Sequence, residues 1–369
     1  MTDTKISLFK VHMPKNIIDP LKKVLFSGFI GQGLKVDEFE KILGNYIGNE
    51  YVLTTNSGTS ALHLALRLSN VGYGDEVIST AMTCTATNEP ILAMGAKIVW
   101  ADIDPKTGNI APEEIRKKIT SKTKAIMAMH WGGYPSDLNE INKIAHEYGI
   151  KVIEDAAHSF GAEYKGKKIG NHSDFICFSF QAIKHITTVD GGALICKSKE
   201  DYKRGKLLRW YGIDREEKGR TDFRCENDIK EYGYKFHMND VCATIGIEQM
   251  KYIDNILCKN RENAKKFDEA FKNHPQIELL DYKKDRSSAY WLYTVLVENR
   301  QNFFDKLNNK GIMVSQVHAR NDTHTMFKKF KTSLPNVDKF SEKMVCIPVG
   351  WWLTKKNIDY IINTVNERW

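Results

Sequence analysis

Cysteine is scarce in this sequence, and its spacing fits neither disulfide bridges nor a metal site. Seven cysteines are spread over 369 residues, and no two of them form a CxxC pair. An odd, widely spaced set favours reduced thiols in a cytoplasmic protein. Neither an HExxH motif nor a Cys/His cluster is present, so we expect no metal ion.

Long apolar runs and a strong charge of one sign are also lacking. No segment approaches about 20 consecutive apolar residues, and the first 20 residues contain no apolar run of signal-peptide length. The formal net charge of +8 is small for this length, so it is weak evidence for nucleic acid but compatible with an anionic ligand. We therefore expect a cytoplasmic protein without a membrane or nucleic-acid partner.

The composition that remains is that of a globular protein, with 42% hydrophobic and 27% charged residues. Strands are expected at 51–55, 76–80, 97–102, 124–130, 151–155, 174–180 and 192–197. Helical patterns separate many of them, starting near 58, 84, 112 and 137. This alternation predicts an α/β fold with a mostly parallel sheet covered on both faces, in which ligands bind beyond the carboxyl ends of the strands.

The pattern changes near residue 250. An amphipathic helix is expected at 34–47, a long charged helix at 251–272, a strand at 289–297 and a helix at 301–310. We predict a large domain over 1–250 and a smaller α+β domain over 251–369, with the N-terminal segment as a candidate to pack on the smaller domain.

Lys184 stands in a polar loop after the apolar strand at 174–180, where an α/β sheet carries its chemistry. A lysine held there can have a lowered pKa and form a Schiff base with a carbonyl. A lysine alone is more often a solvated surface residue.

Two further features favour chemistry. Asp155 ends the strand at 151–155, where it could pair with the pyridine nitrogen of pyridoxal phosphate or simply cap a helix. The turn at 56–60, Asn-Ser-Gly-Thr-Ser, joins a strand to a helix and could bind a phosphate or form an ordinary cap. Phosphate site, pyridine partner and lysine occur in that chain order, which is a stronger signal than any one of them.

The chain resembles the DegT/DnrJ/EryC1/StrS family of pyridoxal-phosphate-dependent nucleotide-sugar aminotransferases. The resemblance covers essentially the whole length, including TNSGTSALHLAL (55–66), EDAAHSFGAEYKGKKIG (154–170) and FSFQAIKHITTVDGG (178–192). It implies the aspartate aminotransferase-like fold (fold type I), with a seven-stranded sheet in the large domain. It also implies roles for single residues, with Lys184 as the catalytic Schiff-base lysine and Asp155 as the pyridine partner. Ser57, Gly58, Thr59 and Ser179 match phosphate-binding positions.

Some positions depart from the family pattern. His158 stands where glutamine is usual, near the phenolic oxygen of the cofactor, and imidazole can still donate a hydrogen bond. Cys84 replaces an aromatic residue that stacks on the pyridine ring. Lys235 replaces an asparagine that reaches the phosphate of the neighbouring subunit in a homodimer. His130 ends a strand on the same edge, where it is either a substrate contact or a structural residue.

The activity implied is transfer of an amino group from glutamate to a nucleotide-linked keto-6-deoxy sugar, in the biosynthesis of amino sugars for surface polysaccharides. Within the family the alternative is a cofactor-dependent sugar dehydratase, in which histidine replaces the lysine. Outside it are a non-catalytic regulator and a nicotinamide dehydrogenase. Intact Lys184 and Asp155 argue against the dehydratase and the regulator. The absence of a GxGxxG motif after a strand argues against the nicotinamide dehydrogenase. His185 is assigned no role.

Overall fold

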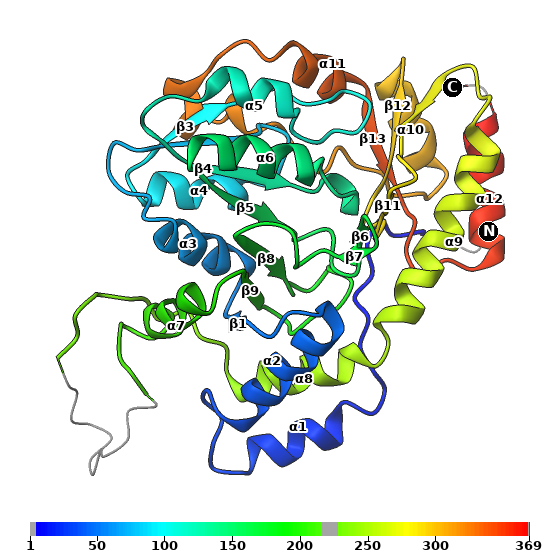
Figure 1. Cartoon of the computed structure of the whole chain (residues 1–369). Helices are drawn as coiled ribbons and strands as arrows, with labels where there is room; N and C mark the ends of the chain where they lie inside the picture. Colours follow the sequence, from blue (N-terminus) through cyan, green and yellow to red (C-terminus); the bar gives the residue numbers. More distant parts are fainter. Residues whose placement is uncertain (1–4, 216–227, 368) are drawn as a thin grey trace.

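The computed structural model describes residues 5–215, 228–367 and 369 (Figure 1). A seven-stranded sheet forms its centre, with the spatial order β1-β9-β8-β5-β4-β2-β3. The neighbours β2–β3, β2–β4, β4–β5 and β5–β8 are parallel, and only β9 runs antiparallel to its neighbours within this sheet. The strands are β1 (Val52–Thr55), β2 (Glu76–Ser79), β3 (Lys97–Trp100), β4 (Thr123–Met129), β5 (Lys151–Asp155), β8 (Phe175–Ser179) and β9 (Gly192–Cys196). The expected α/β fold with a mostly parallel sheet is confirmed.

Helices cover both faces of this sheet because successive side chains of each buried strand point to opposite sides. Met127 and Ile153 pack on one face, and Ile126 and Val152 pack on the other. The first face is covered by α3 (Gly58–Leu68), α4 (Thr85–Ala93) and α7 (Lys199–Leu208) (Figure 1). The second face is covered by α2 (Leu34–Ile47), α5 (Pro112–Lys118), α6 (Leu138–Tyr148) and α8 (Asp240–Met250).

The helix predicted at 34–47 illustrates how the pattern determines the packing. Its apolar residues Val36, Phe39 and Leu43 are fully buried, and they pack against the sheet and α8. Gly48 ends the helix with φ of +86°, a left-handed conformation that glycine adopts readily. An apolar stripe at helical spacing therefore becomes the buried face of α2.

A second sheet, with the order β10-β12-β13, follows the first in the chain. Its strands are β10 (Ile277–Leu279), β12 (Tyr293–Val297) and β13 (Met344–Ile347). It shares an apolar core with α9 (Ile253–Phe271), α10 (Arg300–Asn309) and α12 (Lys355–Asn366). The remaining elements are α1 (Ile18–Leu25), α11 (Pro335–Lys343), the short strands β6 (Glu163–Tyr164), β7 (Lys167–Lys168) and β11 (Arg286–Ser287), and the 3-10 turns Trp131–Gly133, Asn321–Thr323 and Thr325–Phe330.

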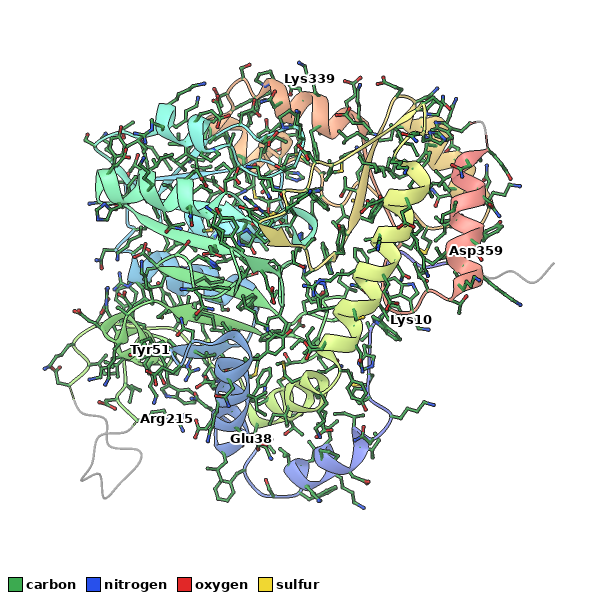
Figure 2. All side chains as sticks on the ribbon, turned by 45° about the vertical axis from the view of Figure 1, so that its right-hand side comes forward. Lys10, Glu38, Tyr51, Arg215, Lys339 and Asp359 are labelled. Atoms are coloured by element: carbon green, nitrogen blue, oxygen red, sulfur yellow. The ribbon has the colours of Figure 1, made fainter. Side chains whose placement is uncertain are left out.

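The N-terminal segment runs from α1 to this second sheet. The backbone N–H of Ile6 donates to the carbonyl of Gly311, and the indole N–H of Trp352 donates to the carbonyl of Ser7. Figure 2 brings this side of the molecule forward and shows Lys10 on the segment. Residues far apart in the sequence thus meet here.

The strand expected at 289–297 is shorter in the structure, where β12 begins at Tyr293. Tyr290 has φ of +46°, outside the range of a strand. The backbone N–H groups of Ala289 and Leu292 donate to the carbonyls of Gly133 and Gly132 instead of to a sheet neighbour. An apolar run was mistaken for one strand because its first half packs against the first sheet.

Among the described residues, no helix is both long enough and apolar enough to cross a membrane.

Candidate functional site

A cavity of about 320 Å³ lies at the edge of the large sheet where β5 and β8 end. The turn after β1, the start of α4 and the loop after β8 also contribute to its walls. It brings together most of the site residues that the sequence predicts: Ser57, Gly58, Thr59, Cys84, Asp155, His158, Ser179 and Lys184.

One wall is the N-terminus of α3, packed tightly against the end of β8. Ser57 caps the helix, and its hydroxyl accepts a hydrogen bond of 3.0 Å from the backbone N–H of Ser60. A Cβ added to Gly58 would lie 2.8 Å from the Cβ of Ser179, so only glycine allows the two segments to come this close. Backbone N–H groups at such a helix start, together with the positive end of the helix dipole, form an anion-binding site.

Asp155, at the end of β5, is 5% exposed and both of its carboxylate oxygens are hydrogen bonded. Oδ1 accepts from the backbone N–H of Ala157 at 3.1 Å, and Oδ2 accepts from the hydroxyl of Thr87 at 2.6 Å. Asp155 caps no α-helix, because a turn follows it. Thr87 was missed by the sequence reasoning, since nothing in the pattern marks one threonine of α4.

Lys184 is half-buried on the cavity wall, with its Nζ 3.7 Å from the ring centroid of Trp291. Burial lowers the pKa of Lys184 to about 8, and the charge of Asp155 opposes this only in part. The indole N–H of Trp291 donates to the carbonyl of Ile183 at 2.9 Å, which ties Trp291 to the lysine loop. Trp291 was also missed, because it lies more than 100 residues further along the chain.

His158 also stacks on Trp291. Its ring centroid lies 3.8 Å from that of Trp291 at an interplanar angle of 24°. The pKa of His158 is well below its usual value, first because of burial and then because of the charge of Lys184, so the ring is neutral at pH 7. Its buried Nδ1 has no hydrogen-bond partner among the residues that the structure describes. His318 also lines the cavity, and its ring stacks on His158 with the two ring centroids 5.6 Å apart. It is the third residue, after Thr87 and Trp291, that the sequence reasoning did not place at the site.

The two remaining residues around the lysine loop behave differently. Cys84 directly precedes α4, is half-buried and lines the cavity. His185 does not line it, and its Nε2 lies 2.9 Å from the carbonyl oxygen of Ala289. His185 therefore packs the loop against the segment before β12.

His130 does not line the cavity, which favours the structural role over the substrate contact among the two interpretations that the sequence left open. Met129 lines the cavity, and the side chain of the next residue points to the opposite face of the sheet. His130 is fully buried there, with its Nε2 3.0 Å from Glu154 and its Nδ1 accepting from the backbone N–H of Ser136. We interpret it as a structural residue.

Lys235 also lies outside this cavity, in an isolated bridge with Trp210. The sequence predicts its side chain at the cavity of a second subunit, and that remains a prediction.

The structure therefore places three groups around one cavity: an anion-binding site at the start of α3, the fixed carboxylate of Asp155 and the amine of Lys184 with its lowered pKa. An anionic ligand with a basic nitrogen and a carbonyl group could engage all three at once.

Comparison with known proteins gives close matches over nearly the whole chain. The family model described as the DegT/DnrJ/EryC1/StrS aminotransferase family matches residues 12–366. A UDP-4-amino-4,6-dideoxy-N-acetyl-beta-L-altrosamine transaminase of Campylobacter jejuni is 33% identical over 94% of this chain and 93% of its own length. The crystal structure of the sugar aminotransferase CalS13 from Micromonospora echinospora superposes with a TM-score of 0.95 and 36% identity, covering 99% of this chain and 100% of that chain.

A further neighbour was solved in two cofactor states. The putative sugar aminotransferase Spr1654 from Streptococcus pneumoniae has a PMP form and a PLP form, which match with TM-scores of 0.91 and 0.90. Both are 28% identical to this chain, and each match covers 98% of both chains.

Proposed function

The chain belongs to the DegT/DnrJ/EryC1/StrS aminotransferase family, and from that premise we propose that it transfers the amino group of glutamate to a keto-6-deoxy sugar carried on a nucleotide. It is a transaminase of the sugar aminotransferase family, has the aspartate aminotransferase-like fold and depends on pyridoxal phosphate. The observation that carries the proposal is that Lys184, Asp155 and the start of α3 line one cavity.

The residues around the cavity fit pyridoxal phosphate. Gly58 brings the start of α3 close to Ser179, and both line the cavity. The anion-binding site at this helix start would hold the phosphate through Ser57, Gly58, Thr59 and Ser179. The carboxylate of Asp155 would be the partner of the pyridine N–H. His158 lines the cavity, and its ring has unused hydrogen-bonding capacity, since Nδ1 has no partner among the described residues. This would allow a hydrogen bond to the phenolic oxygen.

Bound pyridoxal phosphate supplies an electron sink for the charge that remains when a proton leaves the carbon bearing the amine. In our proposal the Nζ of Lys184 removes that proton from the Cα of glutamate. A pKa of about 8 leaves a useful fraction of the amine neutral near pH 7, whereas an ordinary lysine would be almost fully protonated. The apolar face of Trp291 excludes water from one side of the amine.

We further propose a homodimer with shared active sites, in which the ammonium group of Lys235 contacts the phosphate bound by the partner subunit. Support comes from an exposed apolar surface between α1 and α2, where Phe26, Phe29 and Leu34 are each 82% exposed. Surfaces of this kind mark interaction sites. Light scattering would check the assembly, and a monomer at assay concentration would contradict it.

The acceptor is proposed from the relatives. The Campylobacter transaminase is named for a UDP-linked 4-amino-4,6-dideoxy sugar, so the 4-keto form of such a sugar is the first acceptor to test. We propose that the product is an amino sugar for surface polysaccharides.

The test separates the two half-reactions. Purified protein is loaded with pyridoxal phosphate, its absorbance spectrum is recorded before and after excess glutamate, and 2-oxoglutarate is measured. We expect a near-visible band that is lost with glutamate, with one 2-oxoglutarate formed per site. Amination of the keto-sugar is then followed by mass spectrometry.

Two lysine variants serve as a matched pair. Lys184→Ala should lose the band and the activity, whereas Lys122→Ala, at an exposed lysine far along the chain from the loop, should retain both. A wild-type band that does not respond to glutamate would contradict glutamate as donor. Loss of water from the sugar without 2-oxoglutarate would favour a dehydratase.

A further inference from the structure

A short chain of hydroxyl groups runs from the beginning of α4 to Asp155. The hydroxyl oxygens of Thr83 and Thr87 are 2.6 Å apart, and the hydroxyl of Thr87 is 2.6 Å from Oδ2 of Asp155. Both threonines are fully buried. Neither is among the residues to which the resemblance assigns a role.

The direction of these hydrogen bonds follows from the donor inventory. The hydroxyl of Thr87 donates its single proton to Oδ2 of Asp155, because a carboxylate oxygen accepts. With that proton used, Thr87 can only accept from Thr83. Since the N–H of Ala157 occupies Oδ1, donors on both oxygens hold the carboxylate of Asp155 against rotation.

A buried amide pair fixes the beginning of α4 in turn. The Nδ2 of Asn321 donates to the carbonyl of Thr83 at 2.7 Å, and the Nδ2 of Asn88 donates to Oδ1 of Asn321 at 2.8 Å. Asn321 comes from the C-terminal part of the chain. The hydroxyl chain is therefore anchored from two distant parts of the sequence rather than by α4 alone.

We propose that Thr87 is a positioning residue for the cofactor, because its hydroxyl fixes Asp155 with a free lone pair of Oδ2 turned to the pyridine N–H. The inference rests on the proposed pyridine-binding role of Asp155. A hydrogen bond to a charged group is stronger than one between neutral groups, and each carboxylate oxygen has capacity for two. Thr87 therefore does not compete with the ring nitrogen.

The test compares three variants with the wild type. Thr87→Val keeps the shape of the side chain and removes the hydroxyl, and Thr87→Ser restores the hydroxyl. Thr244→Val makes the same change at a buried threonine of α8, whose hydroxyl donates to the carbonyl of Asp240 at 2.7 Å and belongs neither to the hydroxyl chain nor to the amide pair. Melting temperature and circular dichroism of the cofactor-free proteins establish that each variant is folded.

The first readout is the dissociation constant of pyridoxal phosphate, measured by absorbance titration of cofactor-free protein. Loss of one hydrogen bond to a charged group should weaken binding about 10-fold in Thr87→Val. Thr87→Ser and Thr244→Val should stay within about 3-fold of the wild type, a smaller change than the loss of a neutral hydrogen bond would cause.

The second readout is the pH midpoint of the near-visible band and the split between kcat and KM for glutamate. Thr87→Val should shift the midpoint and lower kcat, with KM little changed, because the ring and not the glutamate site is affected. Serine should restore both values, which a merely structural role would not require.

Several outcomes overturn the inference. Wild-type cofactor affinity in folded Thr87→Val contradicts it, as does an equal loss of affinity in Thr244→Val. If Thr87→Val does not fold, Thr87→Ala is compared with Thr87→Ser, and equal affinities contradict it. Failure of the proposed function appears separately, as a wild-type protein that binds pyridoxal phosphate but does not react with glutamate.

Discussion

Replacement of Lys184 by methionine should stabilise the cofactor-free protein while abolishing its activity. The native structure holds the lysine amine in an environment that lowers its pKa from 10.5 to about 8, so the protonated form is disfavoured in the folded state. Methionine has a similar length and no charge, and it would fill the same space beside Trp291.

The size of the effect follows from the pKa shift. At about 1.4 kcal/mol per pKa unit, the lowering corresponds to roughly 3 kcal/mol of penalty in the folded state. Since Lys184 lines a cavity that water can enter, we reduce this to about 2 kcal/mol. For a chain of this length, that raises the melting temperature by roughly 3 °C.

The contribution of Lys184 to the free energy of unfolding depends on pH, and its direction follows from the two pKa values. Below pH 8 the lysine is protonated in both states, and the folded state carries the whole penalty. Between about pH 8 and 10.5 the unfolded chain binds more protons than the folded one, so the stability contributed by Lys184 rises with pH. The advantage of Lys184→Met should therefore be complete at pH 7 and disappear by about pH 10.5.

Differential scanning calorimetry of cofactor-free protein at pH 7 and 10.5, at one protein concentration, measures this difference. Lys122→Met, at an exposed lysine, should match the wild type at both values. A Lys184→Met protein no more stable than the wild type at pH 7 would refute the reasoning. So would a gain of the same size at both pH values, because burial of charge would then not be its cause.

Three further predictions follow from the geometry. Gly58→Ala should weaken binding of pyridoxal phosphate about 10-fold by titration, because the new Cβ clashes with Ser179 and moves the start of α3, a distortion of the size caused by overpacking. His130→Ala should cost about 1–3 kcal/mol in denaturant unfolding, because it leaves the buried side chain of Glu154 without its hydrogen-bond partner, and the folded variant should retain its cofactor affinity because His130 does not line the cavity. Asp155→Asn should bind the cofactor but lower kcat for glutamate about 100-fold or more in stopped-flow assays, since an amide provides no charge to balance a protonated ring.

The sequence predicted helices and strands correctly where one hydrophobic periodicity extended over the whole element. The helix at 34–47 shows three fully buried residues at helical spacing, and the buried strand at 151–155 matches β5 to the residue. The expectation at 289–297 was wrong at its start because apolar content alone cannot tell a strand from a buried irregular segment. The backbone of Tyr290 makes that distinction, and composition does not encode it locally.

His130 shows a signal that was present but not used. The rule that ligands bind beyond the carboxyl ends of parallel strands gives the edge of the sheet, not the face. Strand alternation places the side chains of Met129 and His130 on opposite faces, and Met129 is the one that lines the cavity.

The sequence by itself determined the parts of the site that are local. Ser57 and Gly58 lie where a strand passes into a helix, Asp155 ends a strand, and Lys184 lies in the loop after another. Short-range geometry and chain order were sufficient to predict that they meet at one cavity, and their roles towards a cofactor stay predictions.

Only the tertiary structure decided what surrounds these groups. Three contacts join segments that are distant in the chain. Trp291 contacts the amine of Lys184, the hydroxyl of Thr87 donates to Asp155, and Asn321 donates to the carbonyl of Thr83. Their positions depend on how the sheet, α4 and the C-terminal segments pack together. Such contacts are set by the sum of many apolar burials, and a single residue type at a single position carries no local record of them.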